Sequence, residues 1–589
     1  MPNGRSQDIA VVGSPSSNTE LTVDLLQEAI EERLVGALVA FEATQNGSRI
    51  TSVGQIVGIE LRNRWHEDSV FRNLVKRTGE IPPITNRQDT RIASLVVGAT
   101  FRRGTNGHQP DVLGMVPATG TRVARVDQAL LDQLLTVYRQ EIFYLGRAYA
   151  NDIFYPMWFK HFGSGPRGAG EAYHFGIFGK TGSGKSGLAK MLLLAYARHP
   201  ELGILIIDPQ GEFSLEMSGT RVGQQGLPMD EVLRSMGRPI QHYRIENIQL
   251  DEWDTFEELL VALEFTAQLG IPVASVNNAT QAATVIRDAL EGTVALDQLA
   301  NENALRQALQ AVTTNANAQL VYSTAGRRQQ FVNFVQGILQ DNTRLNGIFR
   351  GSWQPLASLF VPGQGRRTLY GIIQDLLLVG QGGGATVRPA VVIDVSQQGN
   401  RRFWTEGLQK RLLSKLLGML VDFSTRRLST RESANVLVLL DEAHRHAPSG
   451  PIDEKDPEGR RLRSLLRQAV RETRKFGIGW FFISQTLGGL DNELLQQLRI
   501  LFFGFGLALG DEFRKLGEFA GGDKRAMELY QSFRDPHSAP SPELREFPFM
   551  AMGPVSPLAF SGKPLFFSAF VNPQEFLQAN NLPGGQGAR

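Results

Sequence analysis

The sequence predicts an α/β protein with a small β-domain before the α/β domain, a helical insertion within it and a short C-terminal extension after it. Three observations support this fold class. From residue 173 onward, apolar strand-like runs alternate with helical patterns, as in a parallel sheet covered by helices. Short strand-like runs separated by turns precede this region, and a long amphipathic helical stretch interrupts it.

The composition is that of a folded protein with more than one packed unit. The chain has 589 residues, of which 42% are hydrophobic and 20% charged. It has no cysteine, which excludes disulfides, thiolate metal sites and a cysteine nucleophile. The formal charge is only +2, so a nucleic-acid contact requires a local basic surface. No apolar run is long enough for a membrane helix and the N-terminus does not read as a secretory signal, so we expect a cytoplasmic protein without a membrane partner.

The first domain is predicted to be rich in β-strands. Residues 34–123 contain short apolar runs, such as LVGALVAF and RIASLVVGATF, separated by Gly, Asn and charged turns. This spacing is typical of a small barrel or sandwich. A helical pattern follows between Val126 and Tyr144. We expect a flexible N-terminal tail at residues 1–24 and the β-domain at residues 25–150.

The α/β domain is predicted to be divided by an insertion. A strand, a loop, a helix and a second strand follow one another in residues 173–213. Strand patterns resume at residues 389–396, 435–444 and 477–486, and the intervening sequence is mostly amphipathic helix. The predicted boundaries are residues 151–222 and 381–545 for the α/β domain, 223–380 for the helical insertion and 546–589 for the C-terminal extension.

The segment GKTGSGKS, from Gly179 to Ser186, matches the phosphate-binding loop pattern, and it lies between a predicted strand and a predicted helix. Its glycines allow backbone N–H groups to surround a phosphate, and the N-terminus of the helix adds a positive field. Lys185 would reach the β- and γ-phosphates of ATP, and the Ser186 hydroxyl would ligate Mg²⁺. The candidate nucleotide-binding residues of the loop are Gly179, Lys180, Thr181, Gly182, Ser183, Gly184, Lys185, Ser186 and Gly187.

Carboxylates follow two of the predicted strands. Asp441 and Glu442 come directly after the apolar run VLVLL, where Asp441 could order the Mg²⁺ shell and Glu442 could polarise the attacking water. Asp208 ends the run ILIID, and Glu212 follows it. Ligands collect at the carboxyl ends of parallel strands, so Asp208 and Glu212 are also candidate nucleotide-site residues. For Asp208, a purely structural role in the following Pro-Gln-Gly turn has the same weight as a role in the nucleotide site.

An amide and a stripe of arginines complete the candidate set. Gln485 follows the buried-type strand FFIS, where an amide suits a γ-phosphate sensor. Five arginines also recur along one face of a predicted helix. A charged stripe of this kind is often a solvated face, but it could also supply an arginine finger to a neighbouring subunit, worth about 10³–10⁵ in rate. Arg474 is the first candidate for the finger and Arg471 the second. The stripe recurs at helical steps of three and four residues and comprises Arg460, Arg463, Arg467, Arg471 and Arg474.

With these motifs the chain resembles the HerA-type branch of the HerA/FtsK ring translocases. The strings HFGIFGKTGSGKS, ILIIDPQGEF, VLVLLDEAH and RETRKFGIGWFFISQT occur in that family's order, and the β-domain ending in VPATGTRV resembles its small barrel. The helical insertion resembles the family only in position. One departure is Thr473, which stands where the family usually has glycine before Arg474 and Lys475.

The resemblance implies a RecA-like P-loop ATPase domain, a HAS-barrel-like N-terminal domain and a homohexameric ring. It also implies ATP sites between subunits and duplex DNA in the central channel. By position, it implies phosphate-loop, metal and water roles for Lys185, Ser186, Asp441 and Glu442. Asp208, Glu212 and Gln485 would line the same site, and Arg474 would act from the adjacent subunit.

The resulting hypothesis is a magnesium-dependent ATPase that acts as a DNA translocase or helicase subunit with a separate partner. Members of the family work with NurA-type nucleases in DNA-end processing, or with sirtuin-like or nuclease effectors in antiviral defence, and the sequence does not choose between them. Two alternatives stay open: a secretion-type transport ATPase, and an ATP-binding ring scaffold that organises an effector without translocation. A two-lobed DEAH helicase ranks last because the chain has one phosphate loop.

Overall fold

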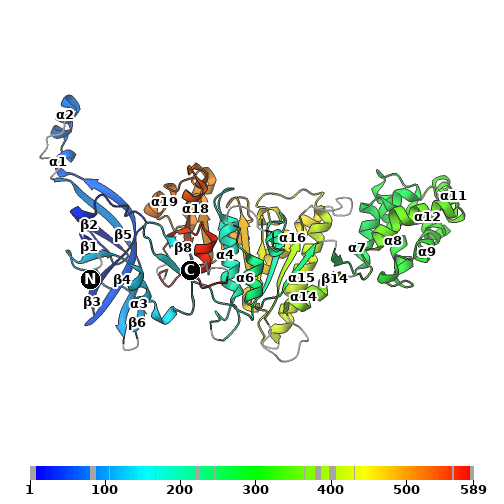
Figure 1. Ribbon diagram of the computed structural model, residues 1–589. Coiled ribbons are helices and arrows are strands. Elements are labelled where there is room, and N and C mark those ends of the chain that lie inside the picture. The colour runs from blue at the N-terminus through cyan, green and yellow to red at the C-terminus, as the bar shows by residue number, and fades with distance from the viewer. Residues whose placement is uncertain are drawn as a thin grey trace.

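Three parts follow one another along the molecule: an N-terminal β-barrel, a central α/β domain and a helical lobe (Figure 1). This confirms the predicted fold class, an α/β protein with a small N-terminal barrel. The computed structural model describes residues 8–79, 88–104, 107–165, 167–220, 226–244, 247–363, 365–377, 387–396, 406–429, 432–559 and 563–583.

The barrel is built from antiparallel strands. Its strands follow the order β2-β1-β7-β3-β4-β5, a further pairing of β2 with β5 closes the ring, and β6 extends β5. Inward-facing apolar side chains such as Val23, Phe41 and Leu95 fill its interior. The strands are β1 (Asp8–Val12), β2 (Glu20–Leu25), β3 (Leu38–Gln45), β4 (Ser48–Arg62), β5 (Thr90–Gly104), β6 (Gly107–Asp111) and β7 (Arg122–Arg125).

The predicted tail at residues 1–24 is wrong from residue 8 onward. Strand β1 and most of β2 lie there and close the barrel, with Ile9 and Leu21 at most 1% exposed. The run DIAVV is too short to be recognised without its partner strands, which lie far away in the sequence. The prediction of short strands for residues 34–123 also missed helices α1 (Arg64–Glu67) and α2 (Ser69–Thr78). These helices project from the end of the barrel (Figure 1).

The central sheet has eleven strands in the order β12-β15-β11-β16-β17-β10-β18-β19-β20-β8-β9. The strands from β12 to β18 are parallel, and the last four add on in antiparallel fashion. Helices cover both faces of the parallel part, so β10 (Phe175–Phe178), β11 (Gly203–Asp208) and β16 (Val436–Leu440) are buried throughout and have continuously apolar sequences. The other strands are β8 (Ile142–Ala148), β9 (Phe154–Trp158), β12 (Ile240–Arg244), β15 (Ala390–Asp394), β17 (Ile478–Ser484), β18 (Ile500–Gly504), β19 (Phe547–Met552) and β20 (Leu565–Ala569).

Several strands cross the predicted domain boundaries. Strand β8, in the predicted β-domain at residues 25–150, pairs with β20 in the central sheet. Strands β19 and β20 make the predicted C-terminal extension an integral part of that sheet. Strand β12, in the predicted helical insertion at residues 223–380, pairs with β15 as an edge strand. All of these pairings join segments distant in sequence, which local patterns do not reveal.

Helices pack around the central sheet, and α4 (Lys185–Ala197) is almost entirely buried. No helix among the described residues has both the length and the apolar character needed to cross a bilayer. The other helices around this domain are α3 (Gln128–Leu134), α5 (Glu212–Met217), α6 (Met229–Ser235), α14 (Leu369–Leu377), α15 (Glu406–Ser429), α16 (Pro457–Glu472), α17 (Asn492–Gln497), α18 (Gly510–Phe519), α19 (Lys524–Gln531) and α20 (Pro573–Ala579).

The helical lobe lies at the opposite end of the molecule from the barrel (Figure 1). Strands β13 (Ile248–Gln249) and β14 (Arg367–Thr368) pair where the chain enters and leaves the lobe. Trp353 is buried at its centre and donates its indole N–H to the carbonyl oxygen of Leu299 at 2.7 Å. The helices are α7 (Trp253–Ala262), α8 (Val276–Glu291), α9 (Glu302–Thr313), α10 (Asn315–Val321), α11 (Ala325–Gln340), α12 (Asn342–Ile348), the π-helical turn Phe349–Trp353 and α13 (Gln354–Ala357).

Two buried histidines are held in the neutral form. Burial lowers the pKa of His174 to about 4 and that of His446 to about 4. One ring nitrogen of His174 accepts the backbone N–H of Trp480 at 3.2 Å, and the other donates to the carbonyl oxygen of Val470 at 2.8 Å. Neither ring nitrogen of His446 has a hydrogen-bond partner among the described residues.

Acid should therefore destabilise the fold. Between about pH 6.5 and pH 4 the unfolded state binds protons that these buried rings do not, so the free energy of unfolding falls as the pH drops through this window. Replacing His446 by Leu should reduce this loss by on the order of 2 kcal/mol at about pH 5. The difference is measured by comparing unfolding midpoints at acidic and neutral pH. The control is His66→Leu, because His66 lies on α1 and is only partly buried. Equal acid sensitivity of the His446→Leu variant and the wild type would contradict this account.

Candidate functional site

The phosphate loop connects the end of β10 to the start of α4. Gly179, Gly182 and Gly184 have φ values of +155°, +81° and +86°, which are left-handed values that favour glycine. A Cβ atom on Gly182 would lie 2.0 Å from the ring of His537, and one on Gly184 would lie 2.6 Å from the ring of Phe547. The glycines therefore allow both the curl of the loop and the close approach of a C-terminal segment.

Lys185 is the first residue of α4 and is 8% exposed. Its Nζ donates to the carbonyl oxygen of Lys180 at 3.0 Å, within the loop itself. Burial lowers the pKa of Lys185, while the nearby carboxylates of Glu442 and Asp441 oppose this effect. The ammonium group is thus placed where it would meet phosphate oxygens bound by the loop.

Asp441 and Glu442 follow β16 and are both 5% exposed. The backbone N–H of Glu442, whose φ of +47° is left-handed, donates to Asp441 Oδ1 at 2.9 Å. Burial and then the charge of Glu442 raise the pKa of Asp441 to about 7. A cation beside this buried carboxyl would favour its ionised form. Together with the Ser186 hydroxyl, Asp441 offers the oxygen ligands that Mg²⁺ prefers, so the residues fit that ion.

Two amides hold the carboxylate of Glu442. The Nε2 atoms of Gln210 and Gln485 each donate to Glu442 Oε1 at 2.7 Å. The other amide atom of Gln485, Oε1, accepts the hydroxyl of Thr181 at 3.3 Å. His444 Nδ1 lies 3.3 Å from Glu442 Oε2. Gln485 therefore links the phosphate loop to Glu442, and Gln210 is a site residue that the candidate set did not include.

The structure separates the two acids that follow β11. Asp208 is fully buried and accepts the backbone N–H groups of Gly211 and Ser214 at 2.8 and 2.7 Å and the Ser214 hydroxyl at 2.8 Å. It stabilises the turn into α5 and does not line the cavity, which agrees with the structural role that has equal weight for it, and its part in the nucleotide site stays a prediction. Glu212 does line the cavity, where its carboxylate pairs with Lys190 Nζ at 2.5 Å.

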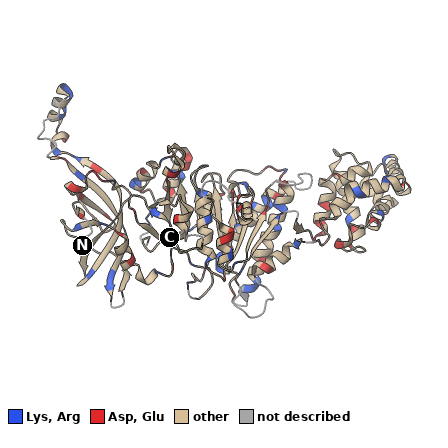
Figure 2. Ribbon diagram, in the orientation of Figure 1, with Lys and Arg blue, Asp and Glu red and all other residues tan. Residues whose placement is uncertain are grey.

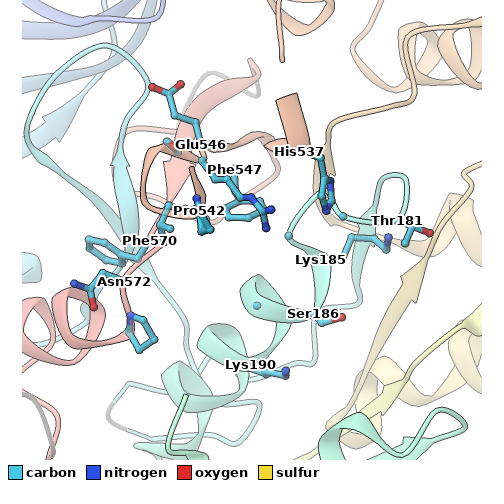
Figure 3. Close-up of a pocket in the computed structure, with 18 of the residues that line it drawn as sticks. Thr181, Lys185, Ser186, Lys190, His537, Pro542, Glu546, Phe547, Phe570 and Asn572 are labelled. Atoms are coloured by element: carbon cyan, nitrogen blue, oxygen red, sulfur yellow. The ribbon is translucent and has the colours of Figure 1, made fainter. Parts of the chain in front are cut away.

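These residues surround a cavity of about 1020 Å³ (Figure 3), at the upper end of the range for ligand pockets. The phosphate loop and α4 form one wall, from which Thr181, Lys185 and Ser186 are exposed to it. Gly179, Lys180 and Ser183 belong to the loop but do not line the cavity. The facing wall comes from the C-terminal part of the chain and includes His537, Pro542, Phe547, Phe570 and Asn572.

Sequence patterns missed this second wall. Phe547 and the residues after it read as strand-forming core residues, and they do form β19. His537 lies in a short 3₁₀ turn, Pro536–Ser538, without any motif around it. Only the pairing of β19 with β18, which lies beside β10, places this segment against the phosphate loop.

Most of the arginine stripe on α16 is satisfied within the subunit. Arg463 donates to the carbonyl oxygens of Pro448 and Gly450 at 3.1 and 2.7 Å. Arg467 pairs with Asp491 at 2.6 Å and with a second carboxylate, that of Glu493, at 3.0 Å. Within the sequence of the stripe itself Glu472 is the one nearby acid, and the residues Asp491 and Glu493 at the start of α17 supply further ones.

The two finger candidates differ from the rest of the stripe. The side chains of Arg471 and Arg474 are 64% and 51% exposed, and neither lines the cavity of its own subunit. Arg474 Nε lies 3.2 Å from Glu171, a carboxylate that Arg499 also contacts at 2.9 Å. Both guanidinium groups are thus available to a neighbouring molecule and not to their own phosphate loop.

Comparisons with known proteins agree with this geometry. Residues 172–350 match the family model described as "Helicase HerA, central domain", a segment that contains the phosphate loop, β11 and most of the helical lobe. This match confirms the predicted resemblance to HerA-type ATPases and the assignment of a P-loop ATPase domain. No curated protein sequence matches the chain significantly.

Similar solved structures are remote. The genome packaging NTPase B204 from Sulfolobus turreted icosahedral virus 2, in complex with AMPPCP, is 10% identical, covering 68% of this chain and 98% of that chain with a TM-score of 0.27. The bacterial conjugative coupling protein TrwB is 12% identical, with 68% and 85% covered and a TM-score of 0.32. VirB4 of Thermoanaerobacter pseudethanolicus is 15% identical, with 74% and 97% covered and a TM-score of 0.33.

Proposed function

We propose, from the HerA-type central domain of this chain, that it is one subunit of a homohexameric ring that hydrolyses ATP to move duplex DNA. The observation that supports this best is the buried Glu442 carboxylate, held at the end of β16 and linked through Gln485 to the phosphate loop. An ATPase needs this connection between a group that activates water and the loop that holds the phosphates.

In the proposed mechanism each side chain has one task. Lys185 binds the β- and γ-phosphates and offsets the charge that develops as the γ-phosphoryl group is transferred. Ser186 and Asp441 would hold Mg²⁺, which would supply further charge neutralisation. Glu442 orients the attacking water and accepts its proton. Gln485, which contacts both Thr181 and Glu442, senses whether the γ-phosphate is present.

A ring arrangement explains the exposed arginines. Arg474, with Arg471 as the second candidate, would reach the γ-phosphate bound to the adjacent subunit. Each site would then be complete only when two subunits meet, which couples hydrolysis to assembly.

We propose that any effector activity resides in a separate chain, either a nuclease or a sirtuin-like subunit, in DNA-end processing or antiviral defence. Among the described residues no group of three or more His, Asp or Glu side chains is placed to hold a metal ion. This agrees with placing any metal-dependent nuclease centre in a partner.

The test is ATP hydrolysis by the purified protein with and without linear duplex DNA, together with its mass in solution. We expect a ring-sized particle, hydrolysis stimulated several-fold by duplex DNA, and no hydrolysis by the Lys185→Ala variant. A ring whose hydrolysis ignores DNA would contradict translocation and favour a transport ATPase or a nucleotide-controlled scaffold.

A further inference from the structure

The outer end of the helical lobe carries an unusual set of charges. Helices α11 and α12 lie there, far from the α/β domain (Figure 1), and the π-helical turn follows them. Residues 325–350 contain four arginines but only one acid, Asp341. None of the four arginines forms an ion pair with another described residue. They are Arg327, Arg328, Arg344 and Arg350, and all but the half-buried Arg328 are exposed.

Elsewhere in the lobe most of the basic side chains are paired with acids. Near its base, Asp251 accepts Lys415 of α15 at 2.6 Å, and Arg411 of the same helix contacts Glu258. Within the lobe, Arg306 pairs with Glu302 at 2.8 Å, and Arg287 lies among four carboxylates. Figure 2 shows acidic and basic residues distributed over the lobe, and basic ones on its outermost helices. The arginines of the outer end therefore differ from Arg287 and Arg306, which carboxylates of the lobe neutralise.

The neighbours of these arginines suit a nucleic-acid backbone. Phe334 is 38% exposed, and the Arg344 guanidinium lies over its ring, 4.4 Å from the ring centre. Exposed amides occur on the same two helices, α11 and α12, and such side chains donate to phosphate and sugar oxygens as arginines do. The amides are Gln330, Asn333, Gln336 and Asn346.

Three apolar side chains anchor α11 to the lobe. Phe331, Val335 and Ile338 are at most 5% exposed, whereas Arg327 in the first turn of the helix is exposed. An ordinary solvated helix face intersperses acids with bases, as an exposed surface gains solubility from both. A surface with arginines, amides and a single acid instead complements a polyanion.

We propose that the outer end of the helical lobe binds the phosphate backbone of duplex DNA, outside the channel through which the ring would pull it. The surface comprises Arg327, Arg328, Arg344 and Arg350 with the exposed amides of α11 and α12. It gives the ring a second hold on DNA that does not depend on nucleotide. The proposal rests on the chain acting on DNA, and its test separates the two claims.

The test is binding of a short fluorescent DNA duplex to the full-length protein, measured by anisotropy over a series of salt concentrations. The triple variant Arg327→Gln, Arg328→Gln, Arg344→Gln should lower the magnitude of the slope of log affinity against log salt by about 2 to 3, because each lost phosphate contact removes about 0.9. Affinity at about 50 mM salt should fall roughly 10³-fold, because this slope difference acts over the ~1.3 decades of salt between about 50 mM and about 1 M. The corresponding Arg→Lys variant should retain the slope, since it retains the charges.

A charge-matched control comes from helix α2 of the barrel, where Arg72, Lys76 and Arg77 are exposed. Changing these three to Gln removes the same charge and should leave DNA binding unchanged. Hydrolysis of ATP without DNA should be the same for all variants and reports their folding.

Three results would overturn the proposal. One is an unchanged salt slope in the triple variant while the wild type binds DNA, which leaves the translocase function standing. Another is an equal loss of DNA affinity and salt slope in the α2 control, which would mean that the overall charge of the protein, and not this surface, determines binding. The third is tighter binding of polyglutamate than of DNA to the same surface, which would indicate an acidic protein partner. A wild-type protein that binds no DNA at low salt would instead overturn the proposed function itself.

Discussion

Replacing Glu442 by Gln should reduce ATP hydrolysis by about 10²–10⁴-fold while leaving ATP binding nearly unchanged. The amide has the shape of the carboxylate, and its oxygen can still accept the hydrogen bonds that Gln210 and Gln485 donate to Oε1 at 2.7 Å. What it loses is the ability to accept a proton from the attacking water. Steady-state hydrolysis and titration with a fluorescent ATP analogue measure the two effects separately.

Glu212→Gln is the matched control for this variant. Glu212 also lines the cavity, but its carboxylate pairs with Lys190 at 2.5 Å and lies on α5 and not at the end of β16. We expect this variant to retain most of the hydrolysis rate. A loss in Glu212→Gln as large as in Glu442→Gln would show that general disturbance of the cavity, and not proton transfer at Glu442, limits the reaction.

The parts of the site that sequence patterns revealed are those encoded locally. The phosphate loop needs glycines at fixed spacing between a strand and a helix, and Asp441 and Glu442 directly follow a continuously apolar strand. The carboxyl ends of parallel strands meet at one edge, so these two signals together predict where Lys185 and Glu442 come close. The contact of Glu442 with Gln485 follows from the same rule, because β16 and β17 are neighbours.

The parts that sequence patterns missed depend on pairing between distant segments. His537 and Phe547 reach the phosphate loop only because β19 lies beside β18. Asp208 has the same position at a strand end as Asp441, yet the residues after it fold back to donate three hydrogen bonds to its carboxylate. A strand-end acid in a sequence therefore predicts a location near the site, and only the local hydrogen bonds decide whether the acid faces the ligand or the backbone.

The arginine stripe illustrates the same limit for charges. Periodicity places Arg463, Arg467, Arg471 and Arg474 on neighbouring turns of one helical face, but it does not show which carboxylates come near them from other elements. Asp491 and Glu493 neutralise Arg467, which removes it from consideration as a finger. Exposure then leaves Arg471 and Arg474, together with Arg460 at the start of α16, as the cationic groups of the stripe that a neighbouring ATP site could use.

Replacing Arg474 by Ala should reduce hydrolysis by about 10³–10⁵-fold in the assembled ring, with ATP binding and ring mass retained. The guanidinium is 51% exposed, and Glu171, at 3.2 Å, is its ion-pair partner among the described residues, so we expect its removal to leave the fold intact. Arg471→Ala is the matched control: Arg471 lies in the last turn of α16, just before the 3₁₀ turn Thr473–Phe476 that holds Arg474, is 64% exposed, and should lose much less. The reverse order of the two losses would transfer the finger role to Arg471.

Mixing two inactive variants decides whether the arginine acts between subunits. An Arg474→Ala subunit keeps Glu442, and a Glu442→Gln subunit keeps Arg474. A site is complete where an Arg474→Ala subunit, which supplies the ATP site with Glu442, meets a Glu442→Gln neighbour, which supplies Arg474. In a ring of heterologous contacts, random mixing in equal amounts produces this combination at roughly a quarter of the interfaces. Activity should therefore return on mixing, to well above the sum of the two variants alone. If the arginine acted on the ATP of its own subunit, activity would not return, because every subunit carries one of the two defects. A mixture as inactive as its components would therefore refute action between subunits.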